Sequence, residues 1–326
     1  MKKRILSGMR PTGKLHLGHL VGALDNWVKL QEEYDCFFMV ADWHALMSEY
    51  EKTDILAESA LDNAIDWLSA GLDPEKSTLF IQSHVPQHLE LQMIFSCLTP
   101  LGWLERCPTY KEQLREIKTR NLNTYGFLGY PVLQAADILV YKADKVPVGE
   151  DQLPHLELTR EIARRFNSLY KKEVFPSPDA ILTKTPRLLG LDGRKMSKSY
   201  NNTINLSDSE ETIKKKIQNM FTDPKRIKLS DKGHPDICNV FSYYSTFIPQ
   251  LKKEVHDWCS DAKLGCTDCK RRLGQGLMDR LKPIYKRRQD LLKDKMRVKK
   301  ILQEGCEKAT AVASRTVREA REAMNI

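Results

Sequence analysis

Apolar runs that alternate with helix-like segments constrain the fold of this chain more than any other feature. Residues 36–42, CFFMVAD, form a continuous apolar run of the kind found in a parallel strand buried on both faces. Strand-like runs at residues 4–8, 77–82 and 145–149 are likewise each followed by a helix-like segment. Repeated strand-then-helix order predicts an α/β fold built on a Rossmann-like, doubly wound parallel sheet. Such a sheet binds its ligands at the carboxyl ends of the strands.

The second half of the chain has a different sequence pattern. Strand-like runs fade, and long basic helical segments replace them, as at residues 211–221 and 271–305. We therefore expect a Rossmann-like domain at residues 1–190, a loop at residues 191–202 and an α-helical domain at residues 203–326. In this division the last helix is free to pack back on the first domain.

Length and charge narrow the class of protein. With 326 residues, the chain is long enough for about two domains with a substantial core. The formal charge of +9 indicates a polyanionic partner, and composition leaves open whether this is a nucleic acid or a membrane surface. The chain has no apolar run approaching the roughly 18 residues of a membrane span, and its start lacks the apolar centre of a signal peptide. We therefore expect a cytoplasmic protein with no membrane association.

The segment PTGKLHLGH, residues 11–19, leads from the first strand-like run into a helix. A helix start offers unpaired backbone N–H groups to an anion, and Gly18 lets a ligand approach the backbone closely. His16 and His19 lie three residues apart, so both can face one site and donate hydrogen bonds to phosphate oxygens. The alternative is that one histidine caps the helix and the other is exposed. A zinc site is less favoured, because no third ligand stands at a useful spacing.

A second charged loop, GRKMSKSYNN, occupies residues 193–202. Lys195 and Lys198 can act there as mobile point charges on a polyphosphate, although a generic pair of lysines at this spacing indicates only a solvated basic loop. Here the five letters KMSKS stand complete, about 180 residues after HLGH. Together the two motifs resemble the paired signatures of the class I aminoacyl-tRNA synthetases.

Further stretches narrow the resemblance. Residues 130–167, with AADIL and VPVGEDQ, look like the tryptophanyl-tRNA synthetase family, and residues 7–24 are similar to its opening. The resemblance implies ATP-dependent activation of L-tryptophan to tryptophanyl-adenylate, with Mg²⁺ on the polyphosphate, and transfer to tRNA(Trp). It also implies a homodimer, a catalytic domain at residues 1–190, a KMSKS loop at residues 191–202 and an anticodon-binding domain at residues 203–326.

Asp137 lies in an apolar helical stretch, where an unpaired carboxylate would be costly. An indole N–H suits such a carboxylate, because indole is a donor only. A tyrosine phenol could donate to the same group, and bonds to local backbone would also satisfy it. Asp137 alone therefore does not separate a tryptophan site from a tyrosine site.

The resemblance implies roles for the remaining site residues. Tyr130 and Gln152 would hold the ammonium and carboxylate end of tryptophan, with Gln134 beside the indole. The chemistry needs no enzyme nucleophile, and the cationic and hydrogen-bonding work would fall to His16, His19, Lys195 and Lys198. The ATP contacts would be Arg10, Pro11, Thr12, Gly18 and His19 at the phosphates, Gly149, Glu150 and Asp151 at the ribose, Leu188 at the adenine through its backbone, and Lys195, Met196, Ser197, Lys198 and Ser199 from the KMSKS loop.

Three positions depart from many members of that family. Arg10 replaces a glutamine, His19 an asparagine and Gln134 a methionine. Arg10 adds a charge near the phosphates, and Gln134 puts an amide beside the indole pocket. Among the other histidines, His44 is a candidate for the rim of the substrate pocket. The remaining five are expected to be structural or exposed: His84, His88, His155, His234 and His256.

Four of the eight cysteines cluster in the basic helical half. Cys238, Cys259, Cys266 and Cys269 have the pattern C-x20-C-x6-C-x2-C. Four thiolates suit either Zn²⁺ or a [4Fe–4S] cluster, and the spacing does not separate the two, nor does it eliminate four unrelated thiols. Some bacterial members of the family carry a [4Fe–4S] cluster on a similar pattern, which favours iron–sulfur.

Other functions remain open from the sequence alone. Tyrosyl-tRNA synthetases share the fold and both signatures. A small-molecule adenylyltransferase also uses an HxGH loop, although it needs neither KMSKS nor a long basic helical half. A non-catalytic RNA-binding paralogue is the third alternative, and the intact HLGH and KMSKS motifs argue against it.

Overall fold

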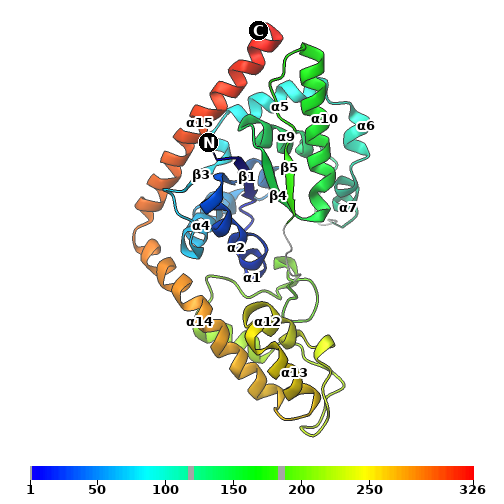
Figure 1. Cartoon of the computed structure of the whole chain (residues 1–326), viewed down its shortest axis with the longest axis vertical. Helices are drawn as coiled ribbons and strands as arrows, with labels where there is room; N and C mark the ends of the chain where they lie inside the picture. The colour runs from blue at the N-terminus through cyan, green and yellow to red at the C-terminus, as the bar shows by residue number, and fades with distance from the viewer. Residues whose placement is uncertain (1, 117–120, 183–187) are drawn as a thin grey trace.

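The computed structural model describes residues 2–116, 121–182 and 188–326. Within these residues, five parallel strands form one sheet: β1 (Arg4–Met9), β2 (Asp35–Val40), β3 (Ser77–Ile81), β4 (Lys145–Val148) and β5 (Asp179–Leu182). Helices cover both faces of the sheet, and a helical region extends away from it (Figure 1). The α/β, Rossmann-like expectation is confirmed.

The order of the strands is β3-β2-β1-β4-β5, so the direction of winding reverses between β1 and β4. At this switch point the carboxyl ends of two neighbouring strands lead into loops that diverge, which leaves a crevice for a ligand. β1 ends at Met9, just before the PTGKLHLGH segment, and β4 ends at Val148, just before Gly149. The topology therefore places both segments at one edge of the sheet.

The helices of the sheet-containing region follow its strands. They are α1 (Leu17–His19), the π-helical turn η1 (Leu20–Leu24), α2 (Asp25–Glu33), α3 (Asp42–Glu49), α4 (Asp54–Ala70), η2 (Gln82–His84), α5 (Gln87–Leu98), α6 (Leu101–Glu105), α7 (Pro108–Glu116), α8 (Tyr125–Leu128), α9 (Tyr130–Val140), η3 (Glu150–Gln152) and α10 (Leu153–Tyr170). The helical stretch expected after HLGH thus continues as the π-helical turn η1 before it becomes the α-helix α2.

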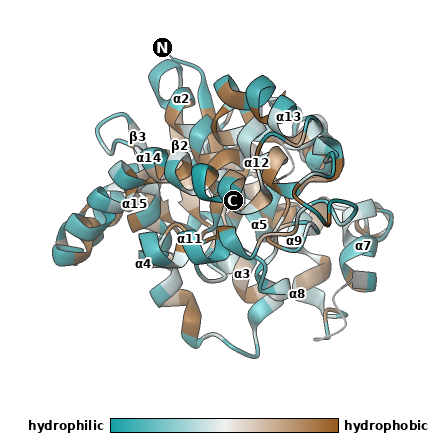
Figure 2. Cartoon of the chain, turned by 90° about the horizontal axis from the view of Figure 1, so that it is seen from below, coloured by the Kyte–Doolittle hydropathy of each residue, from teal (hydrophilic) through white to brown (hydrophobic). Residues whose placement is uncertain are grey.

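A predominantly helical region begins at the end of the KMSKS segment. It comprises η4 (Lys198–Tyr200), α11 (Glu210–Gln218), η5 (Pro235–Ile237), α12 (Asn239–Phe247), η6 (Pro249–Leu251), α13 (Lys252–Ser260), α14 (Cys266–Lys293) and α15 (Lys295–Met324). Seen from below in Figure 2, hydrophilic colouring dominates the outer faces of these helices, and apolar segments turn inward. Within the described residues, no helix combines the length and the apolar character needed to cross a membrane.

The two longest helices tie this region to the sheet. α14 packs on α4, where Arg288 donates to Asp66 Oδ1 at 2.7 Å in a buried ion pair. α15 then runs along β3, as Figure 1 shows. A β-carbon on Gly305 would lie 1.8 Å from the carbonyl oxygen of Leu79, so only glycine permits this approach. The helix thereby covers the edge strand β3, whose backbone would otherwise be open to another chain.

Candidate active site

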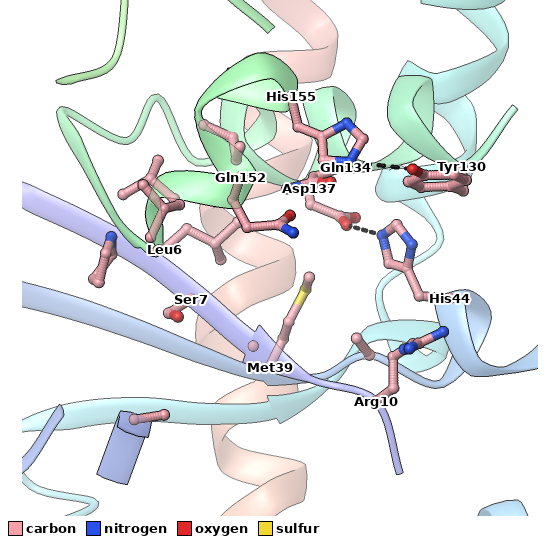
Figure 3. Close-up of a pocket in the computed structure, with 18 of the residues that line it drawn as sticks. Leu6, Ser7, Arg10, Met39, His44, Tyr130, Gln134, Asp137, Gln152 and His155 are labelled. Carbon is pink, nitrogen blue, oxygen red and sulfur yellow. Dashed lines mark hydrogen bonds and ion pairs between the residues drawn. The ribbon is translucent and has the colours of Figure 1, made fainter. Parts of the chain in front are cut away.

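A cavity of about 430 Å³ opens at the switch point between β1 and β4 (Figure 3). Its volume lies within the range of small-molecule sites, which is about 300–1,000 Å³. Tyr130, Gln134 and Asp137 line it from α9, and Arg10 and Gln152 line it from the segments after β1 and β4. The structure therefore gathers around one cavity the residues that the sequence assigns to the amino acid.

Asp137 is fully buried and is held by side chains from three other elements. His44 Nε2 lies 2.7 Å from Oδ2, while His88 Nδ1 and Gln82 Nε2 lie 2.6 and 2.7 Å from Oδ1. Burial alone would raise the pKa of Asp137, but His44 and His88 outweigh it and lower the pKa to about 2. The carboxylate is therefore ionised at neutral pH inside an apolar helix.

Polar side chains from α9, α10, η3 and the segment after β1 line the cavity. The Tyr130 hydroxyl lies 3.1 Å from His155 Nε2, and the two rings are drawn side by side in Figure 3. Gln152 Nε2 donates to Asp151 at 2.8 Å, and Arg10 Nη1 donates to the Ser48 hydroxyl at 3.4 Å. The wall thus offers a phenol, an amide and a guanidinium close to the charged Asp137.

The two histidines of HLGH accept hydrogen bonds from backbone N–H groups of their own segment. His16 Nδ1 accepts from the Gly18 N–H, and His19 Nδ1 accepts from the His16 N–H, both at 3.1 Å. Burial and the nearby Lys198 lower the pKa of His16 to about 4, and burial also lowers the pKa of His19 well below its usual range. Both rings are neutral at pH 7, and because Nδ1 accepts, the proton of each ring sits on Nε2. They are hydrogen-bond donors rather than charges.

The KMSKS lysine reaches the loop after β1. Lys198 Nζ donates to the carbonyl oxygens of Thr12 at 3.1 Å and Gly13 at 3.0 Å. Gly13 has φ of +101°, a conformation that favours glycine. Burial and the Arg10 charge lower the pKa of Lys198 to about 8. A cation is thus held beside the HLGH segment by two neutral backbone carbonyls.

Asn202 shapes the KMSKS loop itself. Its Oδ1 accepts from the Ser197 N–H at 2.8 Å, and its Nδ2 donates to Asp192 at 2.7 Å and to the Lys195 carbonyl at 3.1 Å. A β-carbon on Gly190 would lie 2.2 Å from the Asn202 side chain, so this packing requires glycine there. One buried amide therefore fixes the backbone that carries the lysines.

The other residues expected at ATP are spread around this loop. Met196 is buried, 3.7 Å from where a β-carbon of Gly18 would stand, and its N–H faces the carbonyl of Leu188 at 3.4 Å. The Lys195 side chain is exposed, and the Ser199 side chain lies outside the described part of the structure. Pro11 is buried, whereas Glu150 and Asp151 are exposed beside Gly149, which lines the cavity.

The four clustered cysteines, Cys238, Cys259, Cys266 and Cys269, line a separate small cavity in the helical region. Burial raises the pKa of Cys238, Cys259 and Cys269, and the neighbouring thiols add to the effect. Among the described residues, no group of three or more His, Cys, Asp and Glu side chains has the arrangement of a metal site. The thiols therefore share a cavity without the closed geometry of a coordination shell.

Several residues around the cavity make contacts with Asp137 or Tyr130 that the sequence did not indicate. Gln82 and His88 hold Asp137, and His155 bonds Tyr130, whereas the sequence marked both histidines as structural or exposed. His44, a candidate for the rim, touches the buried carboxylate directly. The signal available for His155 was its position three residues after Gln152, which puts both on one helical face.

Comparisons of the sequence and of the structure with known proteins all match tRNA synthetases. A family model described as class I tRNA synthetases (W and Y) matches residues 1–282. The chain is 53% identical to the tryptophan–tRNA ligase of Thermotoga maritima over 326 residues, covering 99% of each chain. It is 45% identical to the tryptophan–tRNA ligase of Aquifex aeolicus, covering 99% of this chain and 100% of that one. The solved tryptophanyl-tRNA synthetase of Campylobacter jejuni, complexed with ADP and tryptophan, superposes with a TM-score of 0.89 at 34% identity, covering 99% of this chain and 100% of that chain.

Proposed function

The chain belongs to the class I tRNA synthetases, among the tryptophan–tRNA ligases, and from this premise we propose how its residues activate L-tryptophan and charge tRNA(Trp). The tryptophan carboxylate attacks the α-phosphorus of ATP, which forms tryptophanyl-adenylate and releases pyrophosphate. The terminal ribose hydroxyl of the tRNA then attacks the carbonyl carbon of the adenylate, which forms the ester and releases AMP. ATP enters with its Mg²⁺. The enzyme supplies positioning and charge stabilisation rather than a nucleophile.

Asp137 is the residue we assign to the indole. Its Oδ1 already accepts from Gln82 and His88, whereas Oδ2 is bonded to His44. A carboxylate oxygen has two lone pairs, so Oδ2 can also accept the indole N–H. The fixed negative charge strengthens that bond, because charge-assisted hydrogen bonds are roughly twice as strong as neutral ones. Tyr130 and Gln152 line the same cavity, where they would meet the ammonium and carboxylate.

Lys198, His16 and His19 are the residues we assign to the phosphates. The departing pyrophosphate gains negative charge, and a neighbouring ammonium together with two imidazole N–H donors stabilises that charge in the transition state. The observation that supports this most is the pair of bonds from Lys198 Nζ to the Thr12 and Gly13 carbonyls, since they hold the cation next to HLGH. Phosphate oxygens would replace neutral carbonyls as its acceptors.

Other residues are assigned to the ribose, the adenine and the polyphosphate of ATP. Gly149, Glu150 and Asp151 would meet the ribose after β4, and the backbone of Leu188 would meet the adenine. Lys195 is exposed here, so we assign it to the polyphosphate as a second, mobile charge. Arg10 lies in the cavity wall and lowers the pKa of Lys198, which puts its charge between the amino acid and the phosphates.

ATP–pyrophosphate exchange, run separately with tryptophan and tyrosine, tests the proposed function. Tryptophan should support exchange, and tyrosine should support it at a rate lower by a factor on the order of 10³ or more, because the pocket must discriminate through buried hydrogen bonds. Exchange that depends on tyrosine would identify a tyrosine enzyme instead. Absence of exchange with every amino acid would indicate a non-catalytic RNA-binding protein.

We further propose that Cys238, Cys259, Cys266 and Cys269 hold a [4Fe–4S] cluster. The donor set fits, since four thiols line one cavity, and binding would draw them together and deprotonate them. The cluster would be structural, holding the segments before α12, at the end of α13 and at the start of α14. Anaerobic purification followed by iron and zinc analysis tests this proposal. A colourless protein with one zinc per chain would contradict it.

The basic helical region is our candidate for the tRNA surface, with the anticodon bound by residues 203–326. The net charge of +9 favours a polyanion, and binding should weaken steeply as salt displaces the phosphate contacts. We also propose a homodimer in the cytoplasm, as is usual in this family of translation enzymes. Light scattering of the purified protein tests the oligomeric state, and a monomeric mass would contradict it.

A further inference from the structure

His155 joins a thiol to a phenol on the wall of the tryptophan cavity. Its Nε2 lies 3.1 Å from the Tyr130 hydroxyl, and its Nδ1 lies 3.5 Å from Cys107 Sγ. The three groups come from separate helices or their starts: Cys107 precedes α7, Tyr130 opens α9 and His155 lies in the first turn of α10. All are at least nine-tenths buried, at 6%, 9% and 2% exposure. Figure 3 shows the bond between the histidine and the phenol at the edge of the cavity.

The ring of His155 is neutral, and this restricts how the three groups share protons. Burial lowers the pKa of His155 to about 4, so at pH 7 one ring nitrogen carries a proton and the other a lone pair. In the first arrangement, the Cys107 S–H donates to Nδ1 and Nε2–H donates to the Tyr130 oxygen. In the second arrangement, the Tyr130 O–H donates to Nε2 and Nδ1–H points at the sulfur. The two arrangements use the same heavy-atom positions.

The two arrangements give the cavity opposite polarity at Tyr130. In the first, the phenol proton is turned away from His155 and is available to a ligand acceptor. In the second, that proton is taken by His155, so the phenol oxygen offers lone pairs. The Thr109 hydroxyl, which lies within hydrogen-bonding reach of the phenol, can occupy one lone pair. Cys107 also lies within reach of the phenol, but in this arrangement its S–H can donate to the Thr109 hydroxyl at 4.0 Å, so the other lone pair is left for a ligand that donates.

We propose that His155 is a positioning residue that takes up the Tyr130 hydroxyl proton, so that the phenol oxygen faces the cavity as an acceptor for the α-ammonium group of the amino acid. This inference rests on the proposed tryptophan activation. An ammonium group is a donor only, and it therefore selects the second arrangement. A ligand with a carbonyl or carboxylate at that place selects the first. The histidine thus adds discrimination for the amino group without touching it.

Replacement of His155 by phenylalanine removes the proton acceptor and keeps an aromatic ring. We expect the KM for L-tryptophan in pyrophosphate exchange to rise about tenfold or more, because a hydrogen bond to a charged group is lost. The inhibition constant of indole-3-propionate, which is tryptophan without its amino group, should stay within about twofold, a change well below the tenfold that 1.4 kcal/mol represents. His155→Gln, whose amide oxygen can accept, should recover part of the loss. His256→Phe, on the exposed face of α13, serves as the matched control.

The outcomes separate a positioning role from a packing role. If His155→Phe weakens tryptophan and indole-3-propionate equally, or if His155→Gln recovers none of the loss, the residue only shapes the pocket and the inference is wrong. The double variant with Tyr130→Phe provides a second criterion. Once the phenol is gone, His155→Phe should add little to the KM for tryptophan, whereas fully additive effects would overturn the inference. Wild-type protein that shows no tryptophan-dependent exchange would refute the proposed function itself, which is a different result from any of these.

Discussion

In our proposal the site has an amino-acid half and a phosphate half, and the two hold their charges in opposite ways. Asp137 is fully buried, and side chains from α3, η2 and α5 fix it as an ionised carboxylate. Lys198 is half-buried on the KMSKS loop, its acceptors are neutral backbone carbonyls, and its pKa is lowered to about 8. The first half is preorganised before the substrate arrives, and the second keeps a charge that gains most when a phosphate comes close. Recognition and charge stabilisation are thereby assigned to separate structural elements.

The largest expected effect comes from removing the cation of the phosphate half. Lys198→Ala should lower the rate of tryptophan-dependent pyrophosphate exchange by about 10²–10³-fold, since a well-placed donor to the transition state is lost. The KM for tryptophan should hardly change, because Asp137 and its partners are untouched. Wild-type exchange rates in this variant would refute the assignment of Lys198.

The amino-acid half should respond to Asp137→Asn. The substitution keeps the shape of the side chain and removes its charge, so the bonds from His44 and His88 and the proposed indole bond all weaken. We expect the KM for tryptophan to rise about 10- to 100-fold, as for a lost hydrogen bond to a charged group, together with a lower thermal midpoint. The kcat/KM for ATP at saturating tryptophan should change far less. If the kcat/KM for ATP falls by the same factor as the KM for tryptophan rises, the two halves are not separable.

Titration of Lys198 sharpens the same contrast. Because its pKa is lowered to about 8, the ammonium loses its proton as the pH rises through that value, so the charge is present below pH 8 and lost above it. The kcat/KM for ATP, which reports the free enzyme, should then fall by about tenfold per pH unit in the alkaline limb. Lys198→Arg is the matched control, since arginine stays protonated and should remove this limb. A limb that persists in the arginine variant would belong to another group.

The smallest effect on activity should come from the contact between α15 and β3. Gly305→Ala places a methyl group against the Leu79 carbonyl, and we expect a loss of about 1–3 kcal/mol in the free energy of unfolding. Both KM values should stay unchanged at temperatures where the variant remains folded. Glu304→Ala, at the neighbouring exposed position, should change the stability by no more than about 0.5 kcal/mol. A Gly305→Ala variant as stable as wild type would show that α15 shifts to accommodate the methyl group.

Local signals in the sequence were enough to predict the fold and to locate the motifs. Buried parallel strands leave continuous apolar runs, as in residues 36–42, and the complete KMSKS motif identified its own loop. The environment of Asp137 was not accessible in this way. Gln82 and His88 lie about 50 residues or more from Asp137 in sequence, and they meet it because α5 packs on α9 and η2, which follows β3, places Gln82 beside the carboxylate. No periodicity in one segment reports a contact between segments.

Protonation was equally hidden from the sequence. His16 and His19 could be placed on one loop by their spacing, but their neutral state depends on burial and on Lys198, which is far away in the chain. The same applies to His155, whose partners Cys107 and Tyr130 come from other helices. Spacing predicts which side chains share a face, and only the packed structure decides what charge they carry there.

Calorimetric binding of L-tryptophan in the absence of ATP tests the separation of the two halves most directly. Separation of the two halves predicts that Lys198→Ala binds tryptophan with the wild-type dissociation constant, whereas Asp137→Asn binds it about tenfold or more weakly. Equal weakening in both variants, or unchanged binding in Asp137→Asn, would contradict it.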